Sequence, residues 1–301
     1  MLGTTIRGLF AAAAQEGEGG FDIQEMILHH LADSHEWEFM WWTIHLDEIP
    51  MPVLHLGPVT LDLTITKHVL FMFLAAVLVA LVLIPAARRA RKAHEGGAQE
   101  GPTGGHNVVE AFVLFLRDEV AKPNVGPHGE RFYPYIIAVF FFILFSNLLG
   151  LLPWGASPTG NVSVTAALAA VTFVVVEFAG MRDLGLAGYS RTIFYAPPGL
   201  GGVGKYLMMA IMTPVEFLGK LTKPFALAIR LYANMTAGHA VVLALTGLAV
   251  VATGASAFLV VPAPIVMAVA IMLLEIFIAF LQAYIFAILS AVFIGLIRHA
   301  H

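Results

Sequence analysis

Five polar side chains interrupt the long apolar stretches near the end of this sequence. Arg230 and Asn234 lie four residues apart, and His239 follows nine residues after the arginine. Glu275 and Gln282 lie seven residues apart further along the chain. Side chains four or seven residues apart share one face of a helix, whereas nine residues lead to the opposite side. We therefore expect Arg230 and Asn234 on one face and His239 on another.

Ionisable side chains in such surroundings indicate an ion or proton pathway. A charge at the centre of a membrane helix costs about 2.5–3.5 kcal/mol on insertion scales, so it marks a functional site by default. Arginine stays protonated even when desolvated, because its pKa exceeds about 12. No acidic residue lies within four positions of Arg230 to neutralise it. Its partner is expected elsewhere, on a distant segment or on another chain.

Other interpretations of these residues stay open. Arg230 could extend to the headgroup layer, or pair within the chain with Glu216 or Glu275. A lone histidine in an apolar helix is usually a hydrogen-bonded core residue, although imidazole also relays protons near neutral pH. His239 gains that role only beside a titratable group, which Glu275 would supply. Glu216 precedes Arg230 by fourteen residues and shares its face only if Pro224 leaves the helix in phase.

The composition indicates a membrane protein with several spanning helices. Of the 301 residues 59% are hydrophobic and only 12% are charged, whereas an ordinary soluble domain carries about 25% charged residues. Long apolar runs occur at about 69–87, 132–153 and 161–180. Each has close to the ~20 residues that cross a bilayer as a helix. We expect three ordinary membrane helices there.

Two further apolar stretches are too long for upright helices. Residues 206–253 would form a helix of about 72 Å and residues 264–298 one of about 52 Å, against a hydrocarbon thickness of about 30 Å. Pro214 and Pro224 can break or kink the first stretch. We expect these segments to form a hairpin of long, steeply tilted helices.

The basic residues predict the orientation. Seven Lys and Arg residues lie in the loop 88–131 and three in 182–205, whereas the turns 154–160 and 254–263 contain none. Basic loops remain in the cytoplasm. Ten of the twenty acidic residues precede residue 63. We expect these acidic residues, and with them the N-terminus, on the outer side and the C-terminus in the cytoplasm.

The fold class expected from these patterns is an all-α polytopic membrane protein with about five membrane helices. Residues 1–68 would form the acidic outer segment and residues 69–301 the membrane domain. Within the large inner loop, apolar residues recur at helical spacing over 107–122, which predicts an amphipathic helix lying on the membrane surface.

Several kinds of site are not expected. The chain has no cysteine, which excludes disulfides and cysteine-ligated metals. No basic face for nucleic acid exists. The histidines His29, His30 and His35 lack the spacing of a metal site, and the glycine-rich run 199–206 lacks the Ser or Thr of a phosphate-binding loop. We expect neither a metal nor a cofactor.

The segments around the polar side chains resemble a known family. The run KPFALAIRLYANMTAGH at 223–239, followed by EIFIAFLQAYIF at 275–286, is similar to subunit a of the F-type ATP synthase of bacteria. Further similar segments follow the family's order and cover most of the chain: HHLADSHEW at 29–37, FSNLLGLLPW at 145–154, GNVSVTAALA at 160–169 and TPVEFLGKLTKPFALAIRLYANM at 213–235.

The resemblance implies roles for individual residues. Arg230 corresponds to the family's essential stator arginine, with Asn234 as its helical neighbour. Glu216 corresponds to a channel residue on the cytoplasmic side, and Gln282 to the polar residue that faces the arginine.

Two positions depart from the pattern of many relatives. These carry Glu where this chain has His239, and His where it has Glu275, so the imidazole and the carboxylate are exchanged between the two helices. The exchange suggests that the two positions touch and together serve the outer half-channel. Some relatives carry Asp where Gly150 stands, so a polar role at that position is in doubt.

The resemblance implies that the chain is a stator subunit. It would provide two proton half-channels to a rotating ring and so couple proton translocation to ATP synthesis. The partners would be a ring of small carboxylate-bearing hairpin subunits (subunit c), the peripheral-stalk subunit b, the rest of the ATP synthase and membrane lipid. The location would be the bacterial inner membrane, and the chain itself would not be an enzyme. Alternatives are a stand-alone secondary transporter that binds an anionic substrate at Arg230, or a structural membrane scaffold.

Overall fold

The computed structural model describes most of the chain beyond the N-terminal residues. The described residues are 33–34, 36–39, 42–46, 54–56, 59–61, 64–96, 106–152, 154–194, 202–251 and 261–298. His29, His30 and His35, residues 97–105, the first part of the glycine-rich run 199–206 and most of the turn 254–263 lie outside them.

Five of the described helices are long and apolar enough to cross a membrane. They are α3 (Lys67–Gly96), α6 (Tyr133–Gly150), α7 (Val162–Ile193), α8 (Val203–Val251) and α10 (Pro262–Arg298). Their positions lie close to the five predicted segments, and the fold is that of an all-α polytopic membrane protein, as expected.

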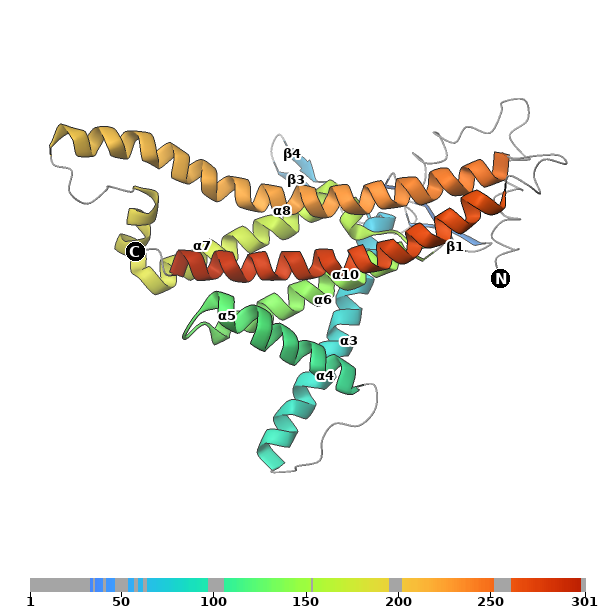
Figure 1. Ribbon diagram of the computed structural model, residues 1–301, viewed down its shortest axis with the longest axis horizontal. Coiled ribbons are helices and arrows are strands. Elements are labelled where there is room, and N and C mark those ends of the chain that lie inside the picture. Colours follow the sequence, from blue (N-terminus) through green and yellow to red (C-terminus); the bar gives the residue numbers. More distant parts are fainter. Residues whose placement is uncertain are drawn as a thin grey trace. The chain divides into compact units, whose positions relative to one another are not determined.

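Helix α8 continues through both of its prolines. Pro214 and Pro224 lie inside the 49-residue helix, and Figure 1 shows α8 (gold to orange) and α10 (red) each as a continuous ribbon. The break that the prolines could have introduced is absent from this described helix. Glu216 and Arg230, fourteen residues apart, therefore stay in phase on one face.

Helix α7 extends well beyond the predicted end at residue 180. Arg182 and Asp183 lower the hydropathy after residue 180, but a polar residue does not by itself end a helix, so apolar content marked the end too early. Gly185 interrupts the regular helix with φ 69° and ψ 168°, a conformation that glycine adopts without a steric penalty. The chain then resumes a short helical segment to Ile193.

The predicted surface helix is present in three consecutive pieces. Helix α4 (His106–Phe115) leads into a π-helical turn η1 (Leu116–Ala121) and then α5 (Lys122–Val125). Pro123 lies two residues after the π-helical turn, and the ring of a proline inside a helix clashes with the preceding turn, which favours a local distortion there. Leu116 and Val120 are fully buried, and Phe115 stacks on Tyr284 of α10.

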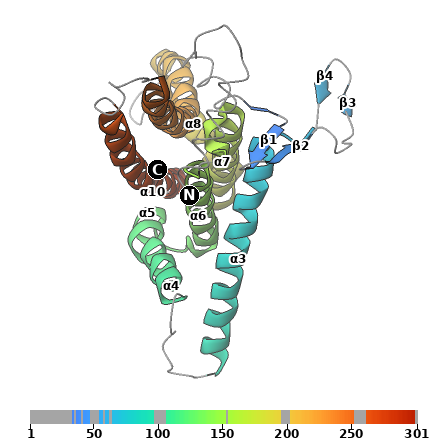
Figure 2. The same cartoon turned by 90° about the vertical axis from the view of Figure 1, so that its right-hand side faces the viewer.

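The acidic N-terminal segment contains two short β-hairpins that the sequence analysis did not predict. Strand β1 (Glu36–Phe39) pairs with β2 (Trp42–His45), and β3 (Leu54–Leu56) with β4 (Val59–Leu61), both antiparallel. Figure 2 shows the first hairpin beside the start of α3. Trp37 packs edge-on against Phe71 and donates a hydrogen bond to the Trp154 carbonyl at 2.9 Å.

Contacts divide the chain into two units, each assembled from distant segments. Unit 1 contains the chain up to Ala76, Phe145–Asn161 and Tyr232–Phe280. Unit 2 contains Val77–Leu144, Val162–Leu231 and Leu281–His301. The buried side chains of unit 1 include Phe71, Leu149, Met235 and Ala279, and those of unit 2 include Ile136, Phe140, Leu231, Phe286 and Ile294.

Candidate functional site

His239 and Glu275 meet inside unit 1. His239 Nδ1 of α8 lies 3.9 Å from Glu275 Oε1 of α10. Glu275 is buried and His239 is half-buried. The structure thus places at ion-pair distance the two residues that the sequence comparison suggested were exchanged between helices.

Two glycines make room for this pair. A Cβ atom at Gly238 would collide with the carboxylate of Glu275, so that carboxylate lies directly against the backbone of α8. A Cβ atom at Gly150 would lie 3.0 Å from His239 Nε2 and would also overlap Ser157. Gly150, where a polar role was in doubt, therefore contributes space beside the imidazole.

The pair keeps atoms available for proton exchange. His239 Nε2 and Glu275 Oε1 are both buried, and within the described residues neither makes a hydrogen bond. Buried polar atoms in folded proteins are nearly always hydrogen-bonded to protein or water. Imidazole exchanges protons readily near neutral pH, and histidine and glutamate both serve as general acids and bases in proteins. The arrangement is suited to passing a proton between the two groups and water.

A buried network of neutral polar groups lies in the same unit. Thr159 donates to Asn147 Oδ1 at 2.6 Å and lies 2.8 Å from the Ser157 hydroxyl, while Asn147 donates to the Ala279 carbonyl at 3.3 Å. These bonds connect the end of α6 to α10 near Glu275. The sequence analysis assigned no role to Asn147, although an amide inside the apolar run 132–153 was a signal for one.

Arg230 lies near the middle of α8 and is exposed. It follows Val203 by about 40 Å of helix and precedes Val251 by about 31 Å. In the described part of unit 2 it forms no ion pair with Glu216 or any other acidic side chain. Its exposed neighbours Phe225 and Ile229 are apolar. The structure therefore presents a positive charge on an apolar surface.

The other two predicted polar residues of this region differ in exposure. Asn234, one turn after Arg230, is exposed as well. Gln282 is buried on α10, and no hydrogen bond joins it to Arg230 among the described residues of unit 2. Its role facing the arginine stays a prediction.

Glu216, which is exposed, borders an open cavity of about 200 Å³ in unit 2. Besides Glu216 the wall contains three further charged side chains, Glu177 of α7 and Lys220 and Lys223 of α8. The remaining wall residues are mostly apolar: Thr172, Phe173, Val176, Thr192, Pro224, Leu227, Phe293, Leu296 and Ile297.

Glu177 and Lys220 form an ion pair in this cavity. Lys220 Nζ lies 3.4 Å from Glu177 Oε2, and each side chain is only 11% exposed. Lys220 also donates to Thr192 Oγ1 at 3.1 Å, and its Nζ lies 4.5 Å from the centre of the Tyr189 ring. Tyr189 donates its hydroxyl proton to Glu177. Sequence reasoning missed Glu177, although an acid in the run VVVEFAG was visible.

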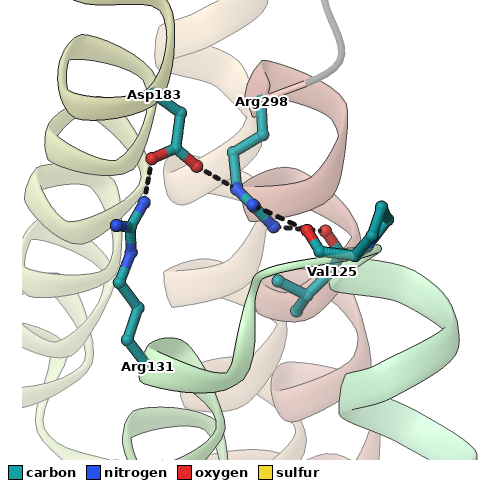
Figure 3. Close-up of polar contacts among 5 residues, drawn as sticks. Val125, Arg131, Asp183 and Arg298 are labelled. Atoms are coloured by element: carbon teal, nitrogen blue, oxygen red, sulfur yellow. Dashed lines mark hydrogen bonds and ion pairs between the residues drawn. The ribbon is translucent and has the colours of Figure 1, made fainter.

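A second charged cluster joins α7 to the start of α6 and to the end of α10 in unit 2 (Figure 3). Asp183 of α7 accepts hydrogen bonds from Arg131, just before α6, and from Arg298 at the end of α10. Arg298 also donates to the carbonyls of Val125 at 2.7 Å and Pro127 at 2.9 Å. One carboxylate thus neutralises part of the charge of two arginines.

Asp33 anchors the N-terminal segment in unit 1. Its carboxylate accepts a hydrogen bond from His68 Nδ1 at 2.8 Å and another from Asn161 at 3.1 Å. Burial raises the pKa of Asp33, but the hydrogen bonds from His68 and Thr66 and the charge of His68 outweigh it, and the pKa falls below its ordinary value.

Within the described residues no cluster of His, Asp and Glu could hold a metal ion.

Comparison with known proteins adds independent evidence. Residues 69–295 match the family model described as ATP synthase A chain. The chain is 41% identical to "ATP synthase subunit a 2" of Chlorobaculum tepidum, over 95% of its own length and 76% of that protein. It is 48% identical to ATP synthase subunit a of Myxococcus xanthus, over 84% of its length and 78% of the relative. The chain belongs to the ATP synthase A chain family.

Proposed function

We propose that this chain is the membrane-sector subunit of an F-type ATP synthase that conducts protons through two half-channels to and from a rotating ring. The rest of the ATP synthase is its partner, and its place is the bacterial inner membrane. The ring would consist of small subunits, each with one carboxylate, and the stalk subunit b would hold this chain in place. The chain takes part in no catalytic step of its own.

The observation that carries this proposal is the position of Arg230. Its guanidinium is exposed on an apolar helix surface, midway along α8, and its own unit supplies no acid within ion-pair distance in the described residues. A carboxylate moving past on a neighbouring ring would satisfy that charge. An opposite charge favours the ionised form of a carboxylate, so Arg230 would promote release of the ring's proton and block a direct leak between the half-channels.

The outer half-channel would be formed around His239 and Glu275. His239 Nε2 and Glu275 Oε1, which are buried and make no hydrogen bond within the described residues, can receive protons from water and pass them toward the ring. Protons would then travel nearly a full turn on the ring and leave through the cavity beside Glu216. Each proton contributes about 2.3 kcal/mol per 100 mV of membrane potential, so several are needed for each ATP.

Two contact clusters support the proposed orientation. In unit 1, Asp33 bonds Asn161 and Trp37 bonds Trp154, as expected if the N-terminal segment and the turn 154–160 share the outer side. In unit 2, Asp183 bonds both Arg131 and Arg298, as expected if both basic loops and the C-terminus share the cytoplasmic side. Membrane insertion favours basic residues on that side.

The alternatives of a stand-alone transporter or a scaffold are not favoured. The family match covers residues 69–295, and Arg230 is not among the residues that line the cavity described in unit 2.

The test is the substitution of Arg230 in the assembled ATP synthase. Arg230→Ala should abolish proton-driven ATP synthesis in membrane vesicles, and Arg230→Lys should reduce it less severely. Assembly of the complex should stay near normal in both variants. Lysine can lose its proton when desolvated, whereas arginine does not. Arg117→Ala, which removes an exposed arginine of the surface helix, is the matched control and should leave synthesis intact. Near-normal synthesis in Arg230→Ala vesicles would refute the proposal.

A further inference from the structure

The cavity of unit 2 contains two carboxylates and two amines within one small space. Glu216, Lys220 and Lys223 come from α8, and Glu177 comes from α7. If Glu216 is to take up and release protons, it must be free of a permanent cationic partner, because a neighbouring cation favours the ionised carboxylate.

Lys220 has two carboxylates to choose from. It follows Glu216 by four residues, and a glutamate four positions before a lysine is the favourable order for a helical ion pair. The structure nevertheless pairs Lys220 with Glu177 at 3.4 Å. Glu216 forms no ion pair within the described residues.

Several contacts hold the Lys220 side chain beside Glu177. Thr192 accepts a hydrogen bond from it, and its ammonium lies over the Tyr189 ring. Tyr189 in turn donates to Glu177. Tyr189 and Thr192 both follow Gly185, so the positive φ of that glycine directs this part of α7 toward the ion pair.

The other side chains near Glu216 do not take the place of Lys220 as its cationic partner. Lys223 lies seven residues after Glu216 on the same face, but its Nζ lies 5.5 Å from the centre of the Phe293 ring on α10. The remaining α10 residues of the wall are Leu296 and Ile297, which carry no charge. Arg298, next along α10, is bonded to Asp183 and to two carbonyls. From α7, Glu177 is the acidic side chain of the wall.

We infer that Glu177 is a positioning residue for the proton exit: it holds Lys220 away from Glu216 and so leaves Glu216 free to exchange protons. This inference rests on the proposed role of Glu216 in the cytoplasmic half-channel. Without Glu177, Lys220 turns to its helical neighbour Glu216 and keeps that carboxylate ionised.

The experiment compares variants in the assembled ATP synthase, in inverted membrane vesicles whose cytoplasmic face is outside. Glu177→Gln should slow ATP-driven proton pumping at least five-fold at neutral pH, with partial recovery as the medium is acidified. The double variant Glu177→Gln with Lys220→Gln should recover at least half of the wild-type rate, because the competing cation is gone. Lys220→Gln alone should also retain at least half. Glu119→Gln, at an exposed glutamate of the surface helix, is the matched control and should pump normally.

The outcomes separate the inference from the function on which it depends. Normal pumping by Glu177→Gln, or a double variant as slow as Glu177→Gln, would overturn the inference. Normal pumping by Glu216→Gln would instead overturn the proposed role of Glu216. Immunoblots for the assembled complex distinguish slow pumping from failed folding, and a pH profile that is shifted in Glu177→Gln but not in the double variant identifies Lys220 as the cause.

Discussion

Asp183 of α7 binds Arg131 before α6 and Arg298 at the end of α10, and its substitution by asparagine has a predictable cost. Asparagine keeps the shape of the side chain but removes the charge that Arg131 and Arg298 share. The bonds of Arg298 to the carbonyls of Val125 and Pro127 remain. Asp183→Asn should therefore loosen the last turn of α10 locally and leave the rest of unit 2 folded.

The size of the effect follows from burial. A hydrogen bond to a charged group contributes about 1.5–3 kcal/mol. Arg298 is only 7% exposed, so its bond to Asp183 should count fully, whereas Arg131 is 37% exposed and its pair should contribute little. We expect a loss of about 2–3 kcal/mol in the free energy of local opening. Since about 1.4 kcal/mol is a factor of ten, amide exchange should become roughly 30- to 150-fold faster.

The assay is native-state hydrogen exchange of the assembled complex, read on peptides that cover the end of α10. Asp118→Asn is the matched control, because Asp118 also binds an arginine, Arg117, but both side chains are largely exposed. Exposed pairs contribute little to stability, so the control should leave exchange unchanged. Equal exchange in Asp183→Asn and wild type, or the same acceleration in both variants, would refute the argument from burial.

Three further predictions concern unit 1. His239→Ala and Glu275→Ala should each reduce proton flux strongly, and the double variant should be hardly worse than either, because both serve one pathway; additive losses would argue against a shared site. Gly238→Ala should reduce flux several-fold with normal assembly, because the added methyl displaces the Glu275 carboxylate, whereas Gly219→Ala, where nothing lies within 4 Å, should be silent. Because folding lowers the pKa of Asp33, its ionised carboxylate stabilises the N-terminal segment at pH values above the unfolded pKa of 3.8. This stabilisation is lost as the pH falls through the folded pKa. Protease cleavage of that segment should therefore accelerate below about pH 4 in wild type, and Asp33→Asn should show rapid cleavage already at neutral pH.

The membrane helices could be predicted because hydropathy is a local property. In lipid, a segment of twenty apolar residues satisfies its own backbone hydrogen bonds only as a helix. The five segments therefore followed from the order of residues alone. The unusual surroundings of Arg230 were evident for the same reason: a guanidinium among apolar residues is costly wherever the helix lies. Both conclusions required no knowledge of which helices are neighbours.

The segment boundaries and the N-terminal hairpins were harder to predict. Hydropathy falls after residue 180, yet α7 continues to Ile193 with an interruption at Gly185. The β1 and β2 strands are short, and a two-stranded hairpin is barely stable alone. Trp37 fixes the first hairpin through Phe71 and Trp154, which are distant in sequence.

The sequence by itself determined the class of protein, the number of membrane helices and the charged residue at the centre of α8. Tertiary structure alone decided that Lys220 pairs with Glu177 rather than with Glu216. It also placed His239 at ion-pair distance from Glu275, a contact that the exchange of the two residues had suggested but that helical spacing could not establish. Helical spacing tells which side chains share a face, but the partner across the contact depends on how two helices are rotated against each other. That rotation is set by small residues such as Gly238, whose importance appears only when the opposing carboxylate is in place.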